Sequence, residues 1–163
     1  MLLLGLVAIV LFVADRVMKY WVLESFALGE ARAFIPGVLQ FRYVQNTGIA
    51  FSFFAESQWV PMVLTPILLI VLGFILVKGM FPCRVQQLCI VAVMVGGISN
   101  WLDRILFGFV VDMLDPVFVR FAVFNLADCY IVVGAAVFFV AYVLAERRRV
   151  REQTLVSTEA EGE

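Results

Sequence analysis

The most informative acids in this chain are Asp112 and Asp128, because both lie among apolar residues. Asp112 follows two valines, and Asp128 stands three residues after Asn125, at the start of a long apolar run. Two carboxylates held close together share one proton, since ionising both would place like charges side by side. The ionised partner can then take a proton from water while the protonated partner polarises a carbonyl group, and the pair titrates as a unit. This chemistry is aspartyl proteolysis, which needs no cofactor.

The residue types that are missing narrow the chemistry further. The chain contains no histidine, which excludes histidine-based triads, histidine–cysteine dyads and nearly all catalytic zinc sites. The cysteines, Cys83, Cys89 and Cys129, are odd in number and form no CxxC motif, so we expect apolar fillers rather than disulfides or metal ligands. A net charge of −1 excludes a broadly basic nucleic-acid binder.

Other polar residues recur at helical spacing. Asp15 and Lys19 are four residues apart with the acid first, which favours an intrahelical ion pair. Two interpretations fit this pair equally: a direct part in a site, or a pair that only lowers the cost of its own burial. Gly96, Asn100 and Arg104 share one helix face. For Gly96 the simpler interpretation is packing, because glycine lets a second helix approach closely.

The elements that position these residues are expected to lie in a membrane. Residues of the set AVILMFWYC form 64% of the chain, charged residues only 15%, and the mean hydropathy is +1.03. A soluble domain is roughly half apolar and one quarter charged, so the natural solvent of this chain is lipid. Uncharged runs at residues 1–14, 57–77, 85–102 and 129–145 predict four spanning helices, at residues 2–23, 59–78, 86–106 and 126–145. The first reaches spanning length only by continuing past Asp15. The expected fold class is an all-α membrane protein with four transmembrane helices.

The charges beside these runs predict the topology. Four arginines stand within residues 147–151, and the short loop at residues 78–84 carries two more positive charges and no acid. Because cytoplasmic loops are enriched in Lys and Arg, we expect both termini in the cytoplasm. Residues 1–145 then form one membrane domain, and residues 146–163 form a basic and then acidic tail that we expect to be disordered. The first run lacks the basic start and the cleavage motif of a signal peptide.

The long outer segment, residues 24–58, is expected to form a small β-containing platform on the periplasmic face. Residues 34–37 are typical of a turn, and residues 38–44 partly alternate apolar and polar, which suits a strand. The uncharged aromatic segment at residues 49–54 suits the membrane interface. Asp112, shortly after Gly108, is expected in a short re-entrant or interfacial turn.

Four blocks of residues together resemble the bacterial lipoprotein signal peptidases, also called signal peptidase II. The blocks are Asp15-x-x-x-Lys19, Asn46-Thr-Gly48-x-Ala50-Phe51, Gly96…Asn100-x-x-Asp103-Arg104-x-x-x-Gly108-x-Val110-Val111-Asp112, and Phe124-Asn125-x-Ala127-Asp128. They appear in the family's order and spacing across nearly the whole chain, and the length and four-span layout also agree. Each block alone is a weak signal, whereas the combination is highly specific.

The resemblance implies an intramembrane aspartyl endopeptidase that needs no metal or other cofactor. Such enzymes remove signal peptides from diacylglyceryl-modified prolipoproteins and cut before the lipidated cysteine. The resemblance implies Asp112 and Asp128 as the catalytic dyad, facing the outer leaflet of the inner membrane. The supporting polar residues that it implies are Asp15, Lys19, Asn46, Gly48, Gly96, Asn100, Asp103, Arg104 and Asn125. The expected partners are lipidated prolipoproteins and membrane lipid, with no nucleic acid; the oligomeric state stays open, with a monomer as the expectation.

The chemistry of these residue types suggests roles that fit this picture. Asn46 and Asn125 can hydrogen-bond the scissile backbone or orient an aspartate. Asn100 and Arg104 can position peptide carbonyls or the dyad, and an arginine there needs the acids as partners. Gly48 would let the substrate backbone pass closely.

The chain departs from the family pattern at several positions. Arg16 and Met18 stand where the family usually has Gln and then Ser or Thr, and Ser99 stands where Gly is usual. The further departures are Ile49 for Ala, Met113 for Phe and Ala122 for Pro. None of them removes a group proposed for catalysis, although they can change the fit of the small substrate residues near the cut.

Three other functions remain alternatives. A small proton-coupled transporter would use Asp112, Asp128 and Arg104 as a relay, but it leaves the outer platform unexplained. A binding or scaffold protein without activity would tolerate Asp112→Asn. A serine–lysine hydrolase would use Lys19, although no serine in the chain has the surroundings of a nucleophile.

Overall fold

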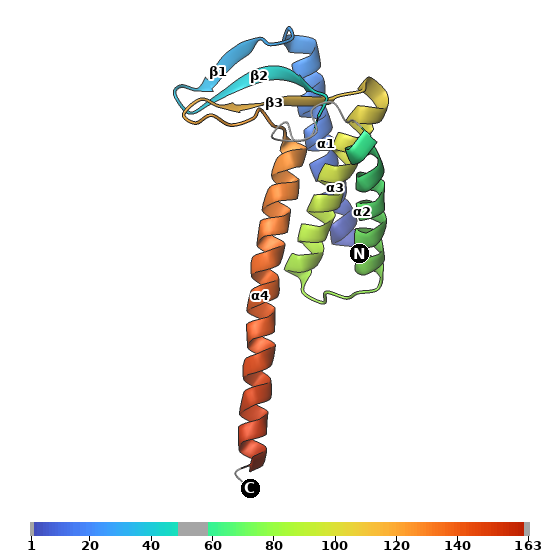
Figure 1. Ribbon diagram of the computed structural model, residues 1–163, viewed down its shortest axis with the longest axis vertical. Coiled ribbons are helices and arrows are strands. Elements are labelled where there is room, and N and C mark those ends of the chain that lie inside the picture. The colour runs from blue at the N-terminus through green and yellow to red at the C-terminus, as the bar shows by residue number, and fades with distance from the viewer. Residues whose placement is uncertain (1, 49–58, 162–163) are drawn as a thin grey trace.

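The computed structural model describes residues 2–48 and 59–161, so the aromatic segment at residues 49–54 lies outside the described residues. The elements within these ranges are α1 (Leu2–Ser25), β1 (Ala31–Ile35), β2 (Leu39–Asn46), α2 (Trp59–Val77), α3 (Arg84–Phe107), β3 (Val110–Pro116) and α4 (Leu126–Glu161). The sheet lies across one end of the helices, and the start of α1 and the end of α4 both point away from it (Figure 1).

Three of these helices are long and apolar enough to cross a membrane, namely Trp59–Val77, Arg84–Phe107 and the part Leu126–Arg151 of α4. α1 does not meet the same measure, because every eighteen-residue stretch of it contains Asp15, Arg16 and Lys19. The predicted mostly helical membrane fold with a small sheet is therefore confirmed. The first of the four predicted spans is not confirmed by length and composition alone.

Strands β1 and β2 form a hairpin at the turn expected from the sequence. The N–H of Val38 donates to the carbonyl oxygen of Ile35 over 2.9 Å, and Gly37 has a φ of 74°. Proline followed by glycine at the centre of a four-residue turn is typical of the type II turn, which needs a positive φ at its third residue. The platform predicted for the outer segment is thus confirmed as a β-structure.

The third strand, β3, comes from a distant part of the chain and pairs antiparallel with β2, which gives the order β1-β2-β3. Asp112 lies within β3, opposite Val44, so the prediction of a re-entrant or interfacial turn at Asp112 is wrong. Nearly every residue of β3 is buried. A strand buried on both faces lacks the alternation of apolar and polar residues that marks a strand in a sequence.

A small apolar core lies between the sheet and the outer end of α1. Val111 and Met113 of β3 pack there with Val22 and Tyr43. Because successive side chains of a strand point to opposite faces, Asp112 faces away from this core. The departure at Met113 therefore concerns packing between the sheet and α1.

The close packing of α3 against α4 depends on Gly96. A Cβ atom at Gly96 would collide with the carbonyl oxygen of Ala127 and lie 2.8 Å from Cγ1 of Ile131. The prediction that this glycine lets a second helix approach is confirmed. Gly96 thus allows the start of α4 to pack closely against the outer half of α3.

The length of α4 differs from the prediction. The sequence predicts a span that ends at residue 145 and a disordered tail, whereas α4 continues to Glu161 and extends past the other helices (Figure 1). The residues after the predicted span are rich in Glu and Arg, which favour helix. Extending an existing helix also avoids the cost of a new nucleus.

Candidate active site

Four charged side chains form a cluster where the outer halves of α1 and α3 meet. We call Asp15, Arg16, Lys19 and Asp103 the ion-paired cluster. Lys19 Nζ lies 3.0 Å from Asp15 Oδ2 and 2.8 Å from Asp103 Oδ2. Arg16 Nη2 lies 2.7 Å from Asp103 Oδ1 and 3.3 Å from Asp15 Oδ2. Both acids are fully buried and Lys19 is 2% exposed, so the balance of two positive and two negative charges is what makes their burial tolerable.

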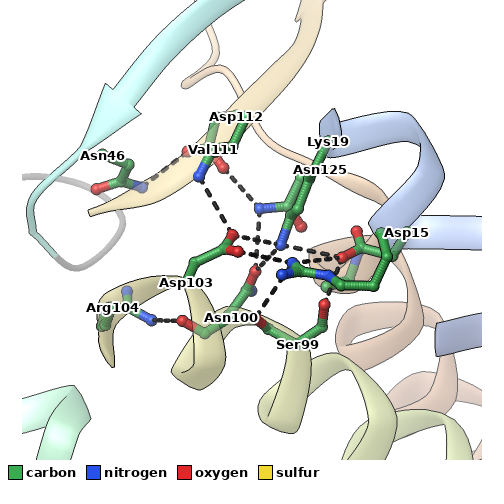
Figure 2. A network of polar contacts seen from close by, with 12 residues as sticks. Asp15, Lys19, Asn46, Ser99, Asn100, Asp103, Arg104, Val111, Asp112 and Asn125 are labelled. Atoms are coloured by element: carbon green, nitrogen blue, oxygen red, sulfur yellow. Dashed lines mark hydrogen bonds and ion pairs between the residues drawn. The ribbon is translucent and has the colours of Figure 1, made fainter. Parts of the chain in front are cut away.

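Two asparagine amides connect this cluster to Asp112 and Asp128. Lys19 Nζ donates to Asn100 Oδ1 over 2.9 Å, and Asn100 Nδ2 donates to Asp128 Oδ1 over 2.7 Å. Asn125 Nδ2 donates to Asn100 Oδ1 over 3.1 Å and to Asp112 Oδ1 over 2.6 Å (Figure 2). The amides thus bring together two acids from a strand and a helix, which we call the amide-held pair.

The first turn of α4 is held by reciprocal hydrogen bonds. The N–H of Asp128 donates to Asn125 Oδ1 over 2.9 Å, and the N–H of Asn125 donates to Asp128 Oδ2 over 3.2 Å. This arrangement is that of a capping box, with Asn125 as the N-cap residue. The N–H of Ala127 donates to Asp15 Oδ1 over 2.9 Å, so Asp15 also fixes the start of α4. Asp128 is therefore both a capping acid and a member of the amide-held pair.

Residues near the end of β2 hold the other side of Asp112. Asn46 Nδ2 donates to Asp112 Oδ2 over 2.9 Å, and the N–H of Gly48 donates to Asn46 Oδ1 over 3.0 Å. Arg104 Nη2 donates to the carbonyl oxygen of Gly48 over 3.3 Å, and its Nη1 donates to that of Asn100 over 3.2 Å. Arg104 also interacts electrostatically with both acids of the amide-held pair. Asn46 thus orients an aspartate, as the sequence allowed, and Gly48 acts through its backbone.

Asp112 has the environment of a carboxyl that exchanges a proton near neutral pH. Its side chain is 1% exposed. Burial first, and the Asp128 carboxylate second, raise the pKa of Asp112 to about 7, although hydrogen bonds from Asn46 and Asn125 and the charge of Lys19 act in the opposite direction. Within the described ranges, neither acid of the amide-held pair forms an ion pair. Perturbed carboxyls of this kind are typical of functional sites.

The structure joins most of the residues singled out from the sequence into one polar network. Those in the network are Asp15, Lys19, Asn46, Gly48, Asn100, Asp103, Arg104, Asp112, Asn125 and Asp128. Gly96 does not join them, because its contacts are those of helix packing. The aromatic segment proposed as a cover for the dyad lies outside the described residues.

Two residues of the network, Arg16 and Ser99, were noted in the sequence only as departures from a family pattern. Ser99 Oγ donates to Asp15 Oδ2 over 2.5 Å, and the carbonyl oxygen of Ser99 accepts a hydrogen bond from Arg16 Nη2 over 3.4 Å. A signal was present, because Arg16 is a charged residue inside an apolar run, and such residues need a partner. In the part of the chain that the structure describes, no group of three or more acid or cysteine side chains could hold a metal ion.

Comparisons with known proteins identify the family of the chain. The family model described as "Signal peptidase (SPase) II" matches residues 7–144. A lipoprotein signal peptidase of Streptococcus pyogenes serotype M5 (strain Manfredo) is 37% identical over 132 residues, which cover 80% of this chain and 87% of that protein. The protein of the same name from serotype M3 (strain SSI-1) has the same identity and coverage.

Two solved structures of bacterial membrane enzymes also resemble this chain. One, determined at 2.3 Å, superposes with a TM-score of 0.81 at 27% identity and covers 86% of this chain and 87% of its own. The other, determined at 1.9 Å, has a TM-score of 0.78 at 27% identity and covers 85% and 91%. The whole arrangement of helices and sheet is therefore shared with membrane enzymes.

Proposed function

The chain belongs to the signal peptidase II family, whose members remove signal peptides from lipoproteins, and we propose that Asp112 and Asp128 are the catalytic residues of this protease. The observation that carries the proposal is the difference in partners between two neighbouring pairs of acids. Amides hold Asp112 and Asp128, whereas lysine and arginine neutralise Asp15 and Asp103. A neighbouring cation favours the ionised form of a carboxylate, so a shared proton belongs on the amide-held pair.

In the proposed mechanism, one acid of the pair accepts a proton from the attacking water molecule. The other acid is protonated and donates a hydrogen bond to the scissile carbonyl oxygen as negative charge develops there. Asn46 and Asn125 fix the two oxygens of Asp112, while Asn100 fixes Asp128. Because the two acids titrate together, the two roles belong to the pair and are not divided between named residues.

We propose that the substrate is a diacylglyceryl-modified prolipoprotein, cut before its lipidated cysteine. Asp112 lies in β3 and Asp128 in the first turn of α4, so the amide-held pair lies where the sheet meets the start of α4. A peptide whose lipid chains stay in the bilayer would present its scissile bond at this depth. The small sheet, with Asn46 at the end of β2, is placed to hold the extended peptide on the outer side.

We propose that α1 spans the membrane as a fourth helix despite its charges. Asp15 and Lys19 of α1 are buried, and Arg16 pairs with Asp103 of α3. Apolar side chains face outward instead, among them Val10, Val13 and Val17, which are at least half exposed. A helix that pairs its charges internally and shows an apolar surface can lie in lipid.

The topology follows from four spans. The start of α1 and the end of α4 lie on the side away from the sheet, and the four arginines within residues 147–151 favour the cytoplasm for that side, because cytoplasmic segments are enriched in Lys and Arg. The active site then faces the outer leaflet of the bacterial inner membrane. In this proposal residues 1–145 form the peptidase domain, the later part of α4 extends into the cytoplasm, and the protein acts as a monomer.

The test is a gel-shift cleavage assay with purified protein in detergent. Wild type and Asp128→Asn are each given a diacylglyceryl-modified prolipoprotein and the same precursor without lipid. Cleavage of the lipidated form by wild type alone supports both the substrate and the dyad. Cleavage of both forms at equal rates overturns the lipid requirement, and cleavage by Asp128→Asn at the wild-type rate overturns the dyad. If a well-folded wild type cleaves neither form, proton flux in vesicles tests the transporter alternative.

A further inference from the structure

Arg16 has no part in the mechanism above, yet it is tied into the network beneath the amide-held pair. Its Nη2 atom lies 2.7 Å from Asp103 Oδ1, 3.3 Å from Asp15 Oδ2 and 3.4 Å from the carbonyl oxygen of Ser99. Its Nε atom is buried without a hydrogen-bond partner among the described residues. Burying a donor without a partner costs free energy. The contacts of Nη2 and the positive charge of the guanidinium must therefore offset this cost.

The charge of Arg16 decides whether the ion-paired cluster is neutral. With Arg16, two cations face two carboxylates. Without it, Lys19 alone would face Asp15 and Asp103, and the cluster would carry one net negative charge. A negative charge near a second group of acids makes each further ionisation there less favourable. The protonation of the amide-held pair therefore depends on whether the neighbouring cluster is balanced.

A short chain of contacts carries this dependence to Asp128. Asp103 binds Arg16 through Oδ1 and Lys19 through Oδ2, so the two cations divide the oxygens of one carboxylate. Lys19 also donates to Asn100 Oδ1, which turns the Nδ2 group of that amide toward Asp128. Because the Lys19 ammonium group can only donate, it must face the Oδ1 atom of Asn100. The Nδ2 group of the same amide is then the end that faces Asp128.

We propose that Arg16 is a positioning residue that sets the pH range of peptide cleavage by balancing the cluster that holds Lys19 and Asn100. The inference rests on the proposed catalytic role of Asp112 and Asp128. The hydrogen bonds and ion pairs of Arg16 go to Asp15, Ser99 and Asp103 and not to either acid of the amide-held pair, so its influence passes through Asp103, Lys19 and the electrostatic field.

Other charged side chains also surround the amide-held pair, and the effect of Arg16 must be separated from theirs. The charged groups come from two of the helices packed around it, Asp15, Arg16 and Lys19 from α1 and Asp103 and Arg104 from α3. Arg104 keeps its contacts to Gly48 and Asn100 when Arg16 is replaced, because the two arginines share no hydrogen-bond acceptor. The effect of Arg16 can therefore be measured with the other charges in place.

The experiment measures the pH dependence of kcat/KM for the lipidated precursor in five proteins. They are wild type, Arg16→Gln, Arg16→Lys, Ser99→Ala and the double variant Arg16→Gln/Asp103→Asn. Ser99→Ala is the matched neutral control, because it removes a hydrogen bond to the same Asp15 carboxylate without changing any charge. Rates are expressed per folded protein, so that a loss of stability does not appear as a change in the pH profile.

We expect Arg16→Gln to move both pH midpoints upward by roughly half a unit, because losing a positive charge makes proton loss from the pair harder. Arg16→Lys and Ser99→Ala should keep the wild-type midpoints, whatever their rates. The double variant removes one charge of each sign, so its midpoints should return toward wild type. If Arg16→Gln does not fold, Asp103→Asn tests the same balance with the opposite sign: it leaves the cluster with one net positive charge and should move both midpoints downward, whereas unchanged midpoints would overturn the inference.

Two results would overturn the inference. One is an Arg16→Gln enzyme whose rate falls with unchanged midpoints, which would mean that Arg16 only stabilises the fold. The other is a double variant whose midpoints lie as far from wild type as those of the single variant. Asp112→Asn serves as the check on the proposed function. If Asp112→Asn still cleaves the precursor, the proposed dyad is wrong. If it is inactive and the midpoints of Arg16→Gln equal those of wild type, only the role of Arg16 is wrong.

Discussion

Two groups of acids lie side by side in this molecule, and their partners differ. In the ion-paired cluster, Asp15 and Asp103 each contact both Lys19 and Arg16 at 3.3 Å or less. In the amide-held pair, Asp112 and Asp128 receive hydrogen bonds from asparagine amides instead. Cations make burial of a carboxylate tolerable in its ionised form, whereas neutral amides leave room for a proton.

The two groups of acids have different roles in this proposal: one holds the helices together, and the other carries out the reaction. The ion-paired cluster joins α1 to α3 and, through Asp15 and Ala127, to the start of α4. It is assembled from residues on helices that pack against one another. The amide-held pair joins a strand to a helix and faces away from the apolar core. In the proposed mechanism the ion-paired cluster therefore holds the helices, and no cation among the described residues forms an ion pair with the two proposed catalytic acids.

The sharpest way to test this difference is to remove each reacting acid. Asp112→Asn and Asp128→Asn should each lower kcat/KM by roughly 10³-fold or more, because the pair loses its acid–base function. The double variant should be no worse than either single one, since the two acids act as a unit. Thermal unfolding in detergent serves as the control, and we expect a small change. Losses that multiply in the double variant would contradict a shared-proton pair.

The same substitution in the ion-paired cluster should affect stability instead. Asp103→Asn leaves Arg16 and Lys19 with a single carboxylate, and breaking a buried ion pair costs about 3–5 kcal/mol. We expect the unfolding temperature of Asp103→Asn to fall well below that of Asp112→Asn. Activity per folded protein should fall less than in the dyad variants. An Asp103→Asn enzyme that is as stable as wild type but inactive would remove the distinction between the two groups.

The pH dependence of stability should differ between wild type and Asp112→Asn. The pKa of Asp112 is raised from 3.8 to about 7, mainly by burial. The folded state therefore binds the proton more tightly than the unfolded chain, and this stabilisation is fully present below about pH 4 and lost as the pH rises through about 7. Wild type should lose a few kcal/mol more than Asp112→Asn across this window, as measured by denaturant unfolding in detergent. Parallel stability curves would contradict a buried, protonated Asp112.

Removing the amide of Asn46, at the end of β2, should lower kcat/KM less than removing either acid. Asn46→Ala removes one donor to Asp112 and one acceptor for the N–H of Gly48. We expect kcat/KM to fall by roughly 10-fold, because Asn125 still holds the other oxygen of Asp112. Gln45→Ala is the matched control, since Gln45 bonds Tyr43 and not the pair. Equal losses in the two variants would assign the effect to the sheet and not to Asp112.

The smallest effect should come from removing metal ions. A chelator should leave the cleavage rate unchanged, because the proposed mechanism uses two carboxylates and one water molecule. The rate is compared before and after dialysis against EDTA, with added Mg²⁺ or Zn²⁺ as the reverse test. Loss of activity that a metal restores would contradict the aspartyl mechanism.

Most of the site could be predicted from the sequence, because charged and amide residues inside apolar runs have few physical explanations. The spacing of Asp15 and Lys19 predicted an ion pair, and the structure contains it at 3.0 Å. The sequence alone could not show that the same pair also caps α4 and holds Asn100. Such contacts join helices that are distant in the sequence, and helical periodicity is informative only within one helix.

The parts that sequence reasoning missed have physical causes. β3 is buried on both faces, so its residues lack the alternation that would have placed Asp112 in a strand. Arg16 was seen only as a departure because its partner, Asp103, lies on another helix. The prediction of a disordered tail underestimates α4, because the Glu and Arg residues that make this segment polar also favour the continuation of a helix.

The most direct test of the central claim is the protonation state of the two groups of acids, measured by infrared titration of the carboxyl band. The account predicts a protonated carboxyl in folded wild type at about pH 6, lost with a midpoint near 7, absent in Asp112→Asn and retained in Asp103→Asn. A band that disappears in Asp103→Asn and persists in Asp112→Asn would place the proton in the ion-paired cluster. That result would contradict the assignment of Asp112 and Asp128 as the reacting pair.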